Sequence, residues 1–218
     1  MIELHHTDCM SYMRGLPDKA FDLAIVDPPY GLGTRTTDGG GGQNRMNRFM
    51  DDIRRSRWDD SIPPPEYFAE VMRVSNNQII WGGNYFGLPA HRTFIVWDKM
   101  TYVPSMSRVE QAWTSFDEPA RYVQINSNQS GRIHPTQKPV ALYRWVLKNY
   151  ANPGQKILDT HLGSGSIAIA CDIEGFDLVG CEIDADYIAG ARKRLADHQA
   201  QPRLFDAPKP TSEQLSAL

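Results

Sequence analysis

The sequence predicts an α/β fold in which a doubly wound, mostly parallel sheet is covered by helices on both faces. Two observations lead to this prediction. Short apolar runs that suit buried strands alternate along the chain with segments of helical spacing. Two of these runs also end in an aspartate that is followed by a proline pair or a glycine-rich turn. Such endings are typical of strands that open into loops at one edge of the sheet.

The chain has 218 residues, of which 41% are hydrophobic and 22% are charged. This length and composition predict a single domain over residues 1–200, with an inserted, mobile basic loop at about 31–60 and a flexible tail over 201–218. The formal net charge of −3 gives no global sign of a nucleic-acid-binding protein. Any surface that binds nucleic acid must therefore be local.

The three cysteines, Cys9, Cys171 and Cys181, are too few and too scattered for a disulfide framework. No CxxC pair or histidine spacing indicates a metal site, so none is expected. The first residues lack the pattern of a secretory signal, and no run approaches eighteen apolar residues. We therefore expect a cytoplasmic protein with no membrane partner.

The pattern predicts eight strand-like runs and five helices. The strands are expected at 2–5, 21–26, 78–81, 93–97, 110–116, 120–125, 156–158 and 178–182, and the helices at 10–16, 67–74, 140–150, 163–174 and 185–198. The runs 110–116 and 120–125 are separated by the turn-forming sequence Asp-Glu-Pro, which predicts that they form an antiparallel pair.

The first motif with chemical content is the strand–loop–helix sequence 156–166. The strand ends at Asp159, and the loop Gly163-Ser164-Gly165 opens the helix. Glycines let the backbone approach a ligand closely, and a helix N-terminus offers free N–H groups. Nineteen residues after Gly163, Glu182 ends the next predicted strand, where it can accept hydrogen bonds from ribose hydroxyls. This order predicts a nucleotide-type cofactor.

A nicotinamide dinucleotide is the main alternative for this cofactor. The dinucleotide fingerprint has a third glycine where this chain has Ala168, but alanine is tolerated there. Asp159 distinguishes the two better, because a carboxylate suits a cationic amino group and suits a pyrophosphate poorly. The motif therefore favours the methionine part of S-adenosylmethionine.

The second motif, Asp27-Pro28-Pro29-Tyr30, directly follows the predicted strand 21–26. Ligands of doubly wound sheets bind at such strand ends. The Asp27 carboxylate and the Pro28 carbonyl can each accept an N–H from an exocyclic amine and aim its lone pair, while the prolines stiffen the loop. Tyr30 offers a ring on which an extruded base can stack.

The third motif, residues 134–139, precedes the predicted helix 140–150. Thr136 and Gln137 can donate hydrogen bonds from their side chains, and Lys138 supplies a positive charge for a carboxylate. His134 begins the segment. The composition of this segment alone is compatible with two roles: it could bind a ligand, or it could simply be a turn that enters a helix.

In this order the three motifs resemble the β group of DNA amino-methyltransferases, a circularly rearranged family in which the catalytic motif precedes the cofactor motif. The resemblance implies a seven-stranded sheet with one antiparallel strand, and S-adenosylmethionine as the methyl donor. It also implies cofactor contacts at the methionine part, the ribose, the adenine end and the third motif. The contacts with the methionine part would come from Asp159, Gly163, Ser164 and Gly165. Glu182 would contact the ribose, and Asp8 would lie near the adenine end. The third motif would contribute His134, Thr136, Gln137 and Lys138.

The resemblance further implies double-stranded DNA as the substrate, and it suggests a homodimer and a companion restriction enzyme as partners. Five arginines beside the catalytic motif are candidates for contacts with the DNA backbone, with a solvated loop as the alternative reading. They are Arg45, Arg48, Arg54, Arg55 and Arg57.

The predicted reaction is therefore methylation of an amino nitrogen in DNA, with Asp27, Pro28, Pro29 and Tyr30 as the catalytic residues. The aspartate at the first position favours N6 of adenine over N4 of cytosine, which remains the alternative. Two further alternatives are a silent subunit that binds S-adenosylmethionine and DNA, which has no need of Asp27, and a dehydrogenase that uses the glycine loop.

Overall fold

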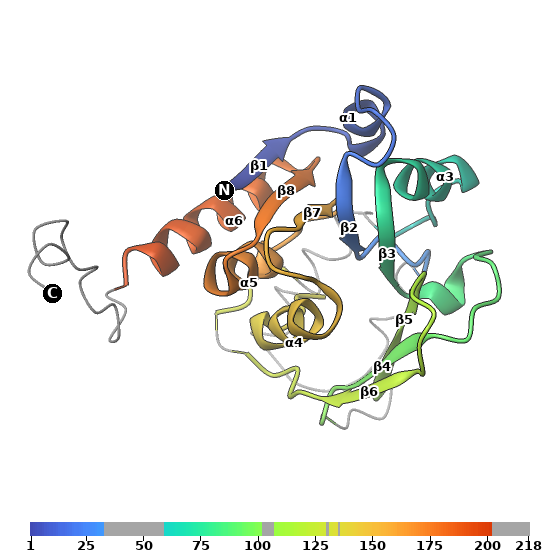
Figure 1. Ribbon diagram of the computed structural model, residues 1–218. Helices are drawn as coiled ribbons and strands as arrows, with labels where there is room; N and C mark the ends of the chain where they lie inside the picture. Colours follow the sequence, from blue (N-terminus) through green and yellow to red (C-terminus); the bar gives the residue numbers. More distant parts are fainter. Residues whose placement is uncertain (33–58, 102–106, 130, 135, 202–218) are drawn as a thin grey trace, which may run out of the picture.

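The computed structural model describes residues 1–32, 59–101, 107–129, 131–134 and 136–201. The five arginines of the predicted basic loop, most of that loop and nearly all of the predicted tail lie outside these ranges. Within them, no helix combines the length and the apolar character that crossing a bilayer requires. The described strands form one sheet with helices on both faces (Figure 1).

Every expected strand and helix is present, with bounds that differ from the prediction by only a few residues. The strands are β1 (Ile2–His6), β2 (Phe21–Val26), β3 (Ser75–Trp81), β4 (Phe94–Asp98), β5 (Val109–Thr114), β6 (Arg121–Gln124), β7 (Lys156–Asp159) and β8 (Asp177–Glu182). The helices are α1 (Cys9–Arg14), α3 (Pro65–Val74), α4 (Val140–Tyr150), α5 (Ser166–Glu174) and α6 (Ala185–Gln199), and a 3-10 turn, η2, spans Gly83–Tyr85.

The sheet has the order β1-β8-β7-β2-β3-β5-β4-β6, so the described residues form eight strands where the family resemblance led us to expect seven. The short β6, which the sequence pattern predicted at 120–125, pairs in parallel with β4 at the edge of the sheet. The expectation of a mostly parallel sheet with one antiparallel strand is confirmed. That strand is β5, which runs against both β3 and β4.

The expected antiparallel pairing of β5 with β6 is wrong, because β4 lies between them. The burial of the two strands explains the difference. β5 buries Ala112 and Thr114 between two neighbours, whereas Val123 is the one buried residue in β6. A strand that is mostly exposed suits an edge, where only one side needs a partner.

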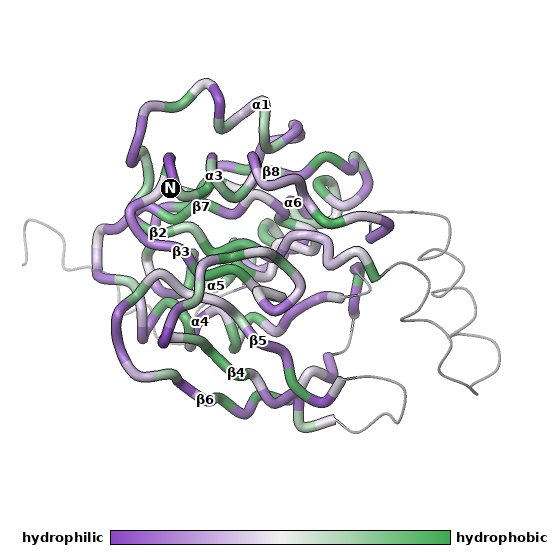
Figure 2. Tube along the Cα trace, turned by 90° about the vertical axis from the view of Figure 1, so that its right-hand side faces the viewer, coloured by the Kyte–Doolittle hydropathy of each residue, from purple (hydrophilic) through white to green (hydrophobic). Residues whose placement is uncertain are grey.

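Helices α4, α5 and α6 cover one face of the sheet, and α1 and α3 cover the other. The alternation of side chains along β3 separates the two cores. Ile79 and Trp81 pack towards α4 and α5, and Ile80 packs towards α3. Hydrophobic segments accordingly gather along the middle strands and the helices that face them (Figure 2).

The chain reverses its direction of winding between β7 and β2. β8 follows β7 on one side, and β3 follows β2 on the other. Leu23 pairs with Ile157 and Ala24 with Leu158, so the carboxyl ends of β2 and β7 lie side by side. In open α/β sheets ligands bind at such a switch point. The fold therefore brings the loop after Val26 next to the loop after Asp159.

We predict that shortening the side chain of Ile79 destabilises the protein in proportion to the atoms removed. Ile79 lies at the centre of the sheet with no exposed surface. Ile79→Val should lower the free energy of unfolding by about 1 kcal/mol and Ile79→Ala by about 2–5 kcal/mol, because neighbours close the cavity only in part. Urea unfolding measures both. Equal losses for the two variants would contradict the close packing described here.

Candidate functional site

The Asp27 carboxylate lies at the end of β2 with both oxygens engaged. The Tyr30 hydroxyl donates to Oδ1 at 2.6 Å, and the Lys138 ammonium lies 2.6 Å from Oδ2. The Asp27 side chain is 16% exposed, so it still reaches the surface of the site. Two contacts from different segments therefore fix the orientation of this carboxylate.

A second aspartate, which the sequence did not indicate, holds the backbone of the same loop. Asp59 Oδ1 accepts hydrogen bonds from the backbone N–H groups of Tyr30 at 2.6 Å and Gly31 at 2.9 Å. Such charge-assisted hydrogen bonds are stronger than neutral ones. The loop that carries Asp27 is thus braced by a residue far along the chain, and no local pattern could have revealed this contact.

The ring of Tyr30 is packed on more than one side. Tyr85 stacks on it with ring centroids 5.0 Å apart, and Phe86 meets it edge-on at 6.1 Å. Gly82 lies so close that an added Cβ would come within 2.2 Å of the ring, and its φ of +71° also favours glycine. Tyr85 is 41% exposed and extends this aromatic surface towards solvent.

Lys138 lies between two carboxylates and is only 2% exposed. Besides Asp27, its ammonium contacts Glu110 Oε2 at 3.1 Å and donates to the Tyr30 hydroxyl at 3.2 Å. Burial pulls the pKa of Lys138 down, but the charges of Asp27 and Glu110 outweigh burial and raise it above its usual value. The sequence analysis grouped Lys138 with the cofactor contacts, whereas the structure places its ammonium against Asp27 of the second motif.

The loop after β7 is tied to the end of β8. Gly163 donates its N–H to Glu182 Oε2 at 2.7 Å, and Asp184 donates its N–H to Glu182 Oε1 at 2.9 Å. Gly165 has a φ of +71°, and an added Cβ there would lie 2.8 Å from Ala191. The predicted order of strand, glycine loop, helix and acidic residue thus forms one connected structure.

Asp159 is a buried carboxyl group next to other acids. It is 1% exposed, and its Oδ1 accepts the N–H of His161 at 3.0 Å. Burial raises the pKa of Asp159 to about 8; the hydrogen bond from His161 opposes this rise, and the charges of Asp27 and Glu182 add to it. A cation placed beside Asp159 would relieve this cost. The site is therefore suited to a ligand with a positively charged amino group.

The segment before α4 packs across the glycine loop. The ring of His134 lies 3.6 Å from where a Cβ on Gly163 would be, and its centroid is 4.4 Å from that of Tyr187. Burial and the charge of Lys138 lower the pKa of His134 to about 4. Thr136 folds back onto His134, while the buried Gln137 accepts the N–H of Ile133.

The end of β8, where Glu182 lies, is next to the end of β1. Asp8 caps α1 by accepting the N–H of Ser11 at 2.8 Å, and the preceding Thr7 donates its N–H to the carbonyl of Glu182. Next to Glu182, Ile183 is 69% exposed. A large apolar side chain so exposed beside a buried acid offers a surface for a flat ligand group. Sequence reasoning missed Ile183.

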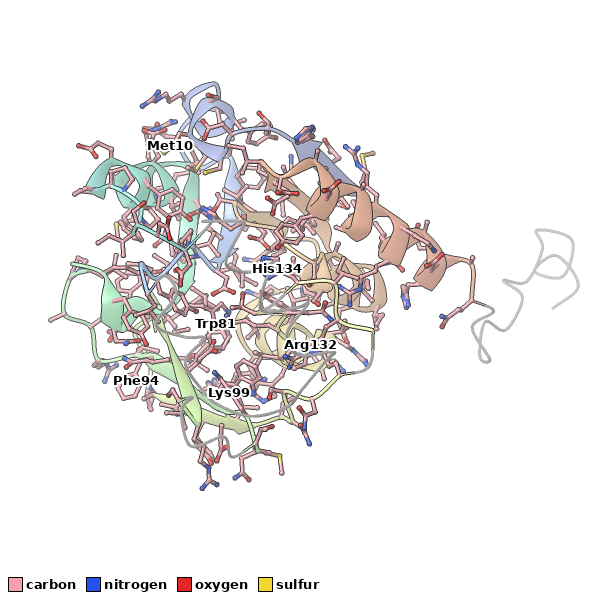
Figure 3. All side chains as sticks on the ribbon, turned by 180° about the vertical axis from the view of Figure 1, so that it is seen from behind. Met10, Trp81, Phe94, Lys99, Arg132 and His134 are labelled. Atoms are coloured by element: carbon pink, nitrogen blue, oxygen red, sulfur yellow. The ribbon has the colours of Figure 1, made fainter. Side chains whose placement is uncertain are left out.

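The structure brings the described members of the three motifs to one edge of the sheet. It adds the previously unassigned Glu110, Lys99 and Asp59; Figure 3 marks Lys99 together with Trp81 and His134. The Lys99 side chain is only 16% exposed, and its ammonium lies 2.6 Å from Glu110 Oε1.

A family model described as DNA methylase, for enzymes of the N6 and N4 type, matches residues 80–193, just over half of the chain. The type II methyltransferase M.HpaI of Haemophilus parainfluenzae is 24% identical over 227 residues, which cover 87% of this chain and 72% of that protein.

Solved methyltransferases share the fold. The M1.HpyAVI–SAM complex matches with a TM-score of 0.56 and 21% identity, over 89% of this chain and all of the other. The PvuII DNA methyltransferase, described as cytosine-N4-specific, matches with a TM-score of 0.58 and 12% identity, over 90% of each chain. With the family model, these likenesses complete the assignment that the motif order suggested. The chain belongs to the N6/N4 family of DNA methyltransferases.

Proposed function

We propose that this chain methylates N6 of adenine in an extruded base of double-stranded DNA, with S-adenosylmethionine as the methyl donor of its family. The observation that carries this proposal is the placement of Asp27. Its carboxylate is held in a fixed orientation at the end of β2, beside the buried Asp159 at the end of β7. Acceptor and donor would thus meet across the switch point of the sheet.

Asp27 would orient the amino group. An exocyclic amine is a poor nucleophile, because its lone pair is delocalised into the ring of the base. Each oxygen of the Asp27 carboxylate can accept more than one hydrogen bond, so one can receive an N–H while Tyr30 and Lys138 remain in place. The carbonyl of Pro28 would receive the second N–H. The amine is thereby held with its lone pair turned towards β7, and Asp27 can accept the proton that it loses.

The residues around the glycine loop fit the cofactor. Asp159 would pair with the amino group of the methionine part, next to the backbone of Gly163, Ser164 and Gly165. When bound, S-adenosylmethionine supplies a methyl group activated by its sulfonium. Glu182 can still accept hydrogen bonds from the ribose, since each of its oxygens uses one of its lone pairs within the protein.

The remaining cofactor contacts lie around this centre. We propose that the adenine of the cofactor lies near Asp8 and the exposed Ile183. His134, Thr136 and Gln137 would close the pocket from the side of α4, because the ring of His134 packs against Gly163. Lys138 would act on Asp27 and not on the cofactor, since its ammonium already lies between two carboxylates.

The extruded base would stack on the aromatic surface that Tyr30 shares with Tyr85. The arginines Arg45, Arg48, Arg54, Arg55 and Arg57 remain our proposal for contacts with the DNA backbone, as guanidinium groups pair well with phosphate. The single-domain organisation over residues 1–200, a homodimer and a companion restriction enzyme also remain proposals.

Cytosine N4 is the second candidate for the methylated atom. It is favoured by the likeness to the PvuII enzyme, whose description is cytosine-N4-specific. The aspartate at position 27 favours adenine. The two candidates share the chemistry described above, so they differ only in the base that the pocket admits.

Labelled S-adenosylmethionine distinguishes the candidates. After incubation of the protein with tritiated S-adenosylmethionine and unmethylated DNA of mixed sequence, we expect the label in N6-methyladenine once the DNA is digested to nucleosides. Label in N4-methylcytosine would instead show that cytosine N4, the second candidate, is the methylated atom. Tight cofactor binding without any label would indicate a silent subunit and contradict the proposal.

We predict that Asp27→Ala lowers turnover by about two or more orders of magnitude, as the loss of a positioning group does. The affinity for S-adenosylmethionine should change little, because Asp27 orients the amine and not the cofactor. Single-turnover methyl transfer and calorimetric titration of the cofactor measure the two effects. A variant with near-native turnover would refute the role of Asp27.

We predict that cofactor affinity rises with pH up to about 8 and that Asp159→Asn removes most of this dependence. Below about pH 8 the Asp159 carboxyl is protonated in the free protein. It must release that proton to pair with a cationic amine, so the binding constant increases by up to about tenfold per pH unit in this range. Titration calorimetry in several buffers measures the affinity and the proton release. Wild-type affinity that does not vary with pH would contradict the assignment.

A further inference from the structure

Four charged side chains of alternating sign form a chain that ends at Asp27. Lys138 lies 2.6 Å from Asp27 and 3.1 Å from Glu110, and Lys99 lies 2.6 Å from Glu110. They come from four segments: the end of β2, the residues before α4, the start of β5 and the end of β4. Within the described residues, each of the two inner charges, Lys138 and Glu110, lies between two charges of opposite sign.

All four side chains are largely buried, with exposed fractions of 16% for Asp27, 2% for Lys138, 21% for Glu110 and 16% for Lys99. A buried charge without a partner is strongly destabilising, so removal of a single member leaves a neighbouring buried charge with one partner fewer. The Lys138 ammonium also faces the Trp81 ring, 5.2 Å from its centroid. With only 2% of its side chain exposed, Lys138 has little contact with bulk water that would compensate for a lost partner.

Lys138 needs Glu110 because its other partner is shared with the substrate. In the proposed reaction Asp27 accepts N–H groups and then a proton, and at that stage it no longer balances the charge of Lys138. Glu110 stays ionised, because burial raises the pKa of its carboxyl but the two lysines lower it further, to below the usual value. Glu110 is therefore the lasting countercharge that keeps the ammonium in place.

The single antiparallel strand explains how Glu110 reaches the site. Parallel strands present their last residues at the ligand-binding edge. β5 runs the other way, so it presents its first residues there. Glu110 pairs in register with Trp97 of β4, and Lys99 follows two residues later. Reversal of this one strand thus brings a carboxylate behind the catalytic loop, next to the lysine that follows the end of β4.

We propose that Glu110 is a positioning residue for methyl transfer, which acts through Lys138, with Lys99 as its support, to hold the Asp27 carboxylate in its productive orientation. This inference rests on the proposed role of Asp27 and extends it to two segments that carry none of the three sequence motifs. Glu110 itself touches neither the amine nor the cofactor in this arrangement.

The test compares Glu110→Gln with a matched control, Glu174→Gln, in methyl transfer from tritiated S-adenosylmethionine to DNA of mixed sequence. Glu174 is 14% exposed and lies 2.6 Å from Arg144 and 3.4 Å from Lys148, at the far end of α5. We expect Glu110→Gln to lower kcat about tenfold or more, with KM for DNA and the affinity for the cofactor within about twofold of wild type. The control should keep kcat. An unchanged kcat in Glu110→Gln would overturn the inference.

The pH dependence of kcat gives an independent test, because the loss of a residue with only a structural role would not shift it. The titratable groups that act on Lys138 are Asp27, Glu110, Asp159 and His134, together with the hydroxyl of Tyr30. Removal of Glu110 takes away one of the two carboxylates that raise the pKa of Lys138. In Glu110→Gln the fall of kcat at alkaline pH should therefore begin at a lower pH than in wild type. Superimposable profiles would count against the inference.

A second variant covers the case in which Glu110→Gln folds poorly. The double variant Lys99→Gln with Glu110→Gln removes the pair as a unit and leaves no new unpaired charge. It should unfold at nearly the wild-type temperature and still show the low kcat, whereas wild-type kcat would overturn the inference. Asp27→Ala, assayed in parallel, separates the two proposals. If it keeps its turnover, the role of Asp27 fails; if it is inactive while both Glu110 variants are normal, only the present inference fails.

Discussion

The pairing of β2 with β7 is the constraint on which the site depends. It places the ends of two strands that are far apart in the sequence next to each other, with Asp27 beyond one and Asp159 at the end of the other. Both strands are buried in the middle of the sheet, so their register is fixed by the cores on the two faces. A shift of either strand would separate the two aspartates and leave each with nothing to act on.

This arrangement brings two carboxyl groups together, and the protein gives them different electrostatic environments. Asp27 has the ammonium of Lys138 beside it and a hydroxyl donor in Tyr30. Asp159 has one backbone N–H and a pKa of about 8. The charge of the Asp27 carboxylate is balanced within the protein, whereas the charge of the Asp159 carboxylate would be balanced by a cationic ligand. That difference in electrostatic environment separates the proposed substrate side of the site from its cofactor side.

The loop after β2 is also held by residues from outside its own motif. Asp59 binds the backbone N–H groups of the loop, Gly82 leaves room for the ring of Tyr30, and Lys138 fixes the carboxylate of Asp27. Proline alone stiffens a loop, but it does not aim a side chain. Preorganisation of this kind requires partners from several segments, and here they come from the turn after β3, from Asp59 and from the segment before α4.

The sequence alone determined the positions of the strands and helices, the alternating α/β pattern and the two aspartates that end their strands, because these features depend on local periodicity and on residues such as proline and glycine. The family resemblance correctly gave the single antiparallel strand, but it implied seven strands where the described residues form eight. Only the tertiary structure decided that β4 lies between β5 and β6, that Lys138 contacts Asp27, and that Glu110, Lys99 and Asp59 belong to the site. The physical reason is that these contacts join residues distant in the chain, whose meeting depends on strand order and register and leaves no trace in any local pattern.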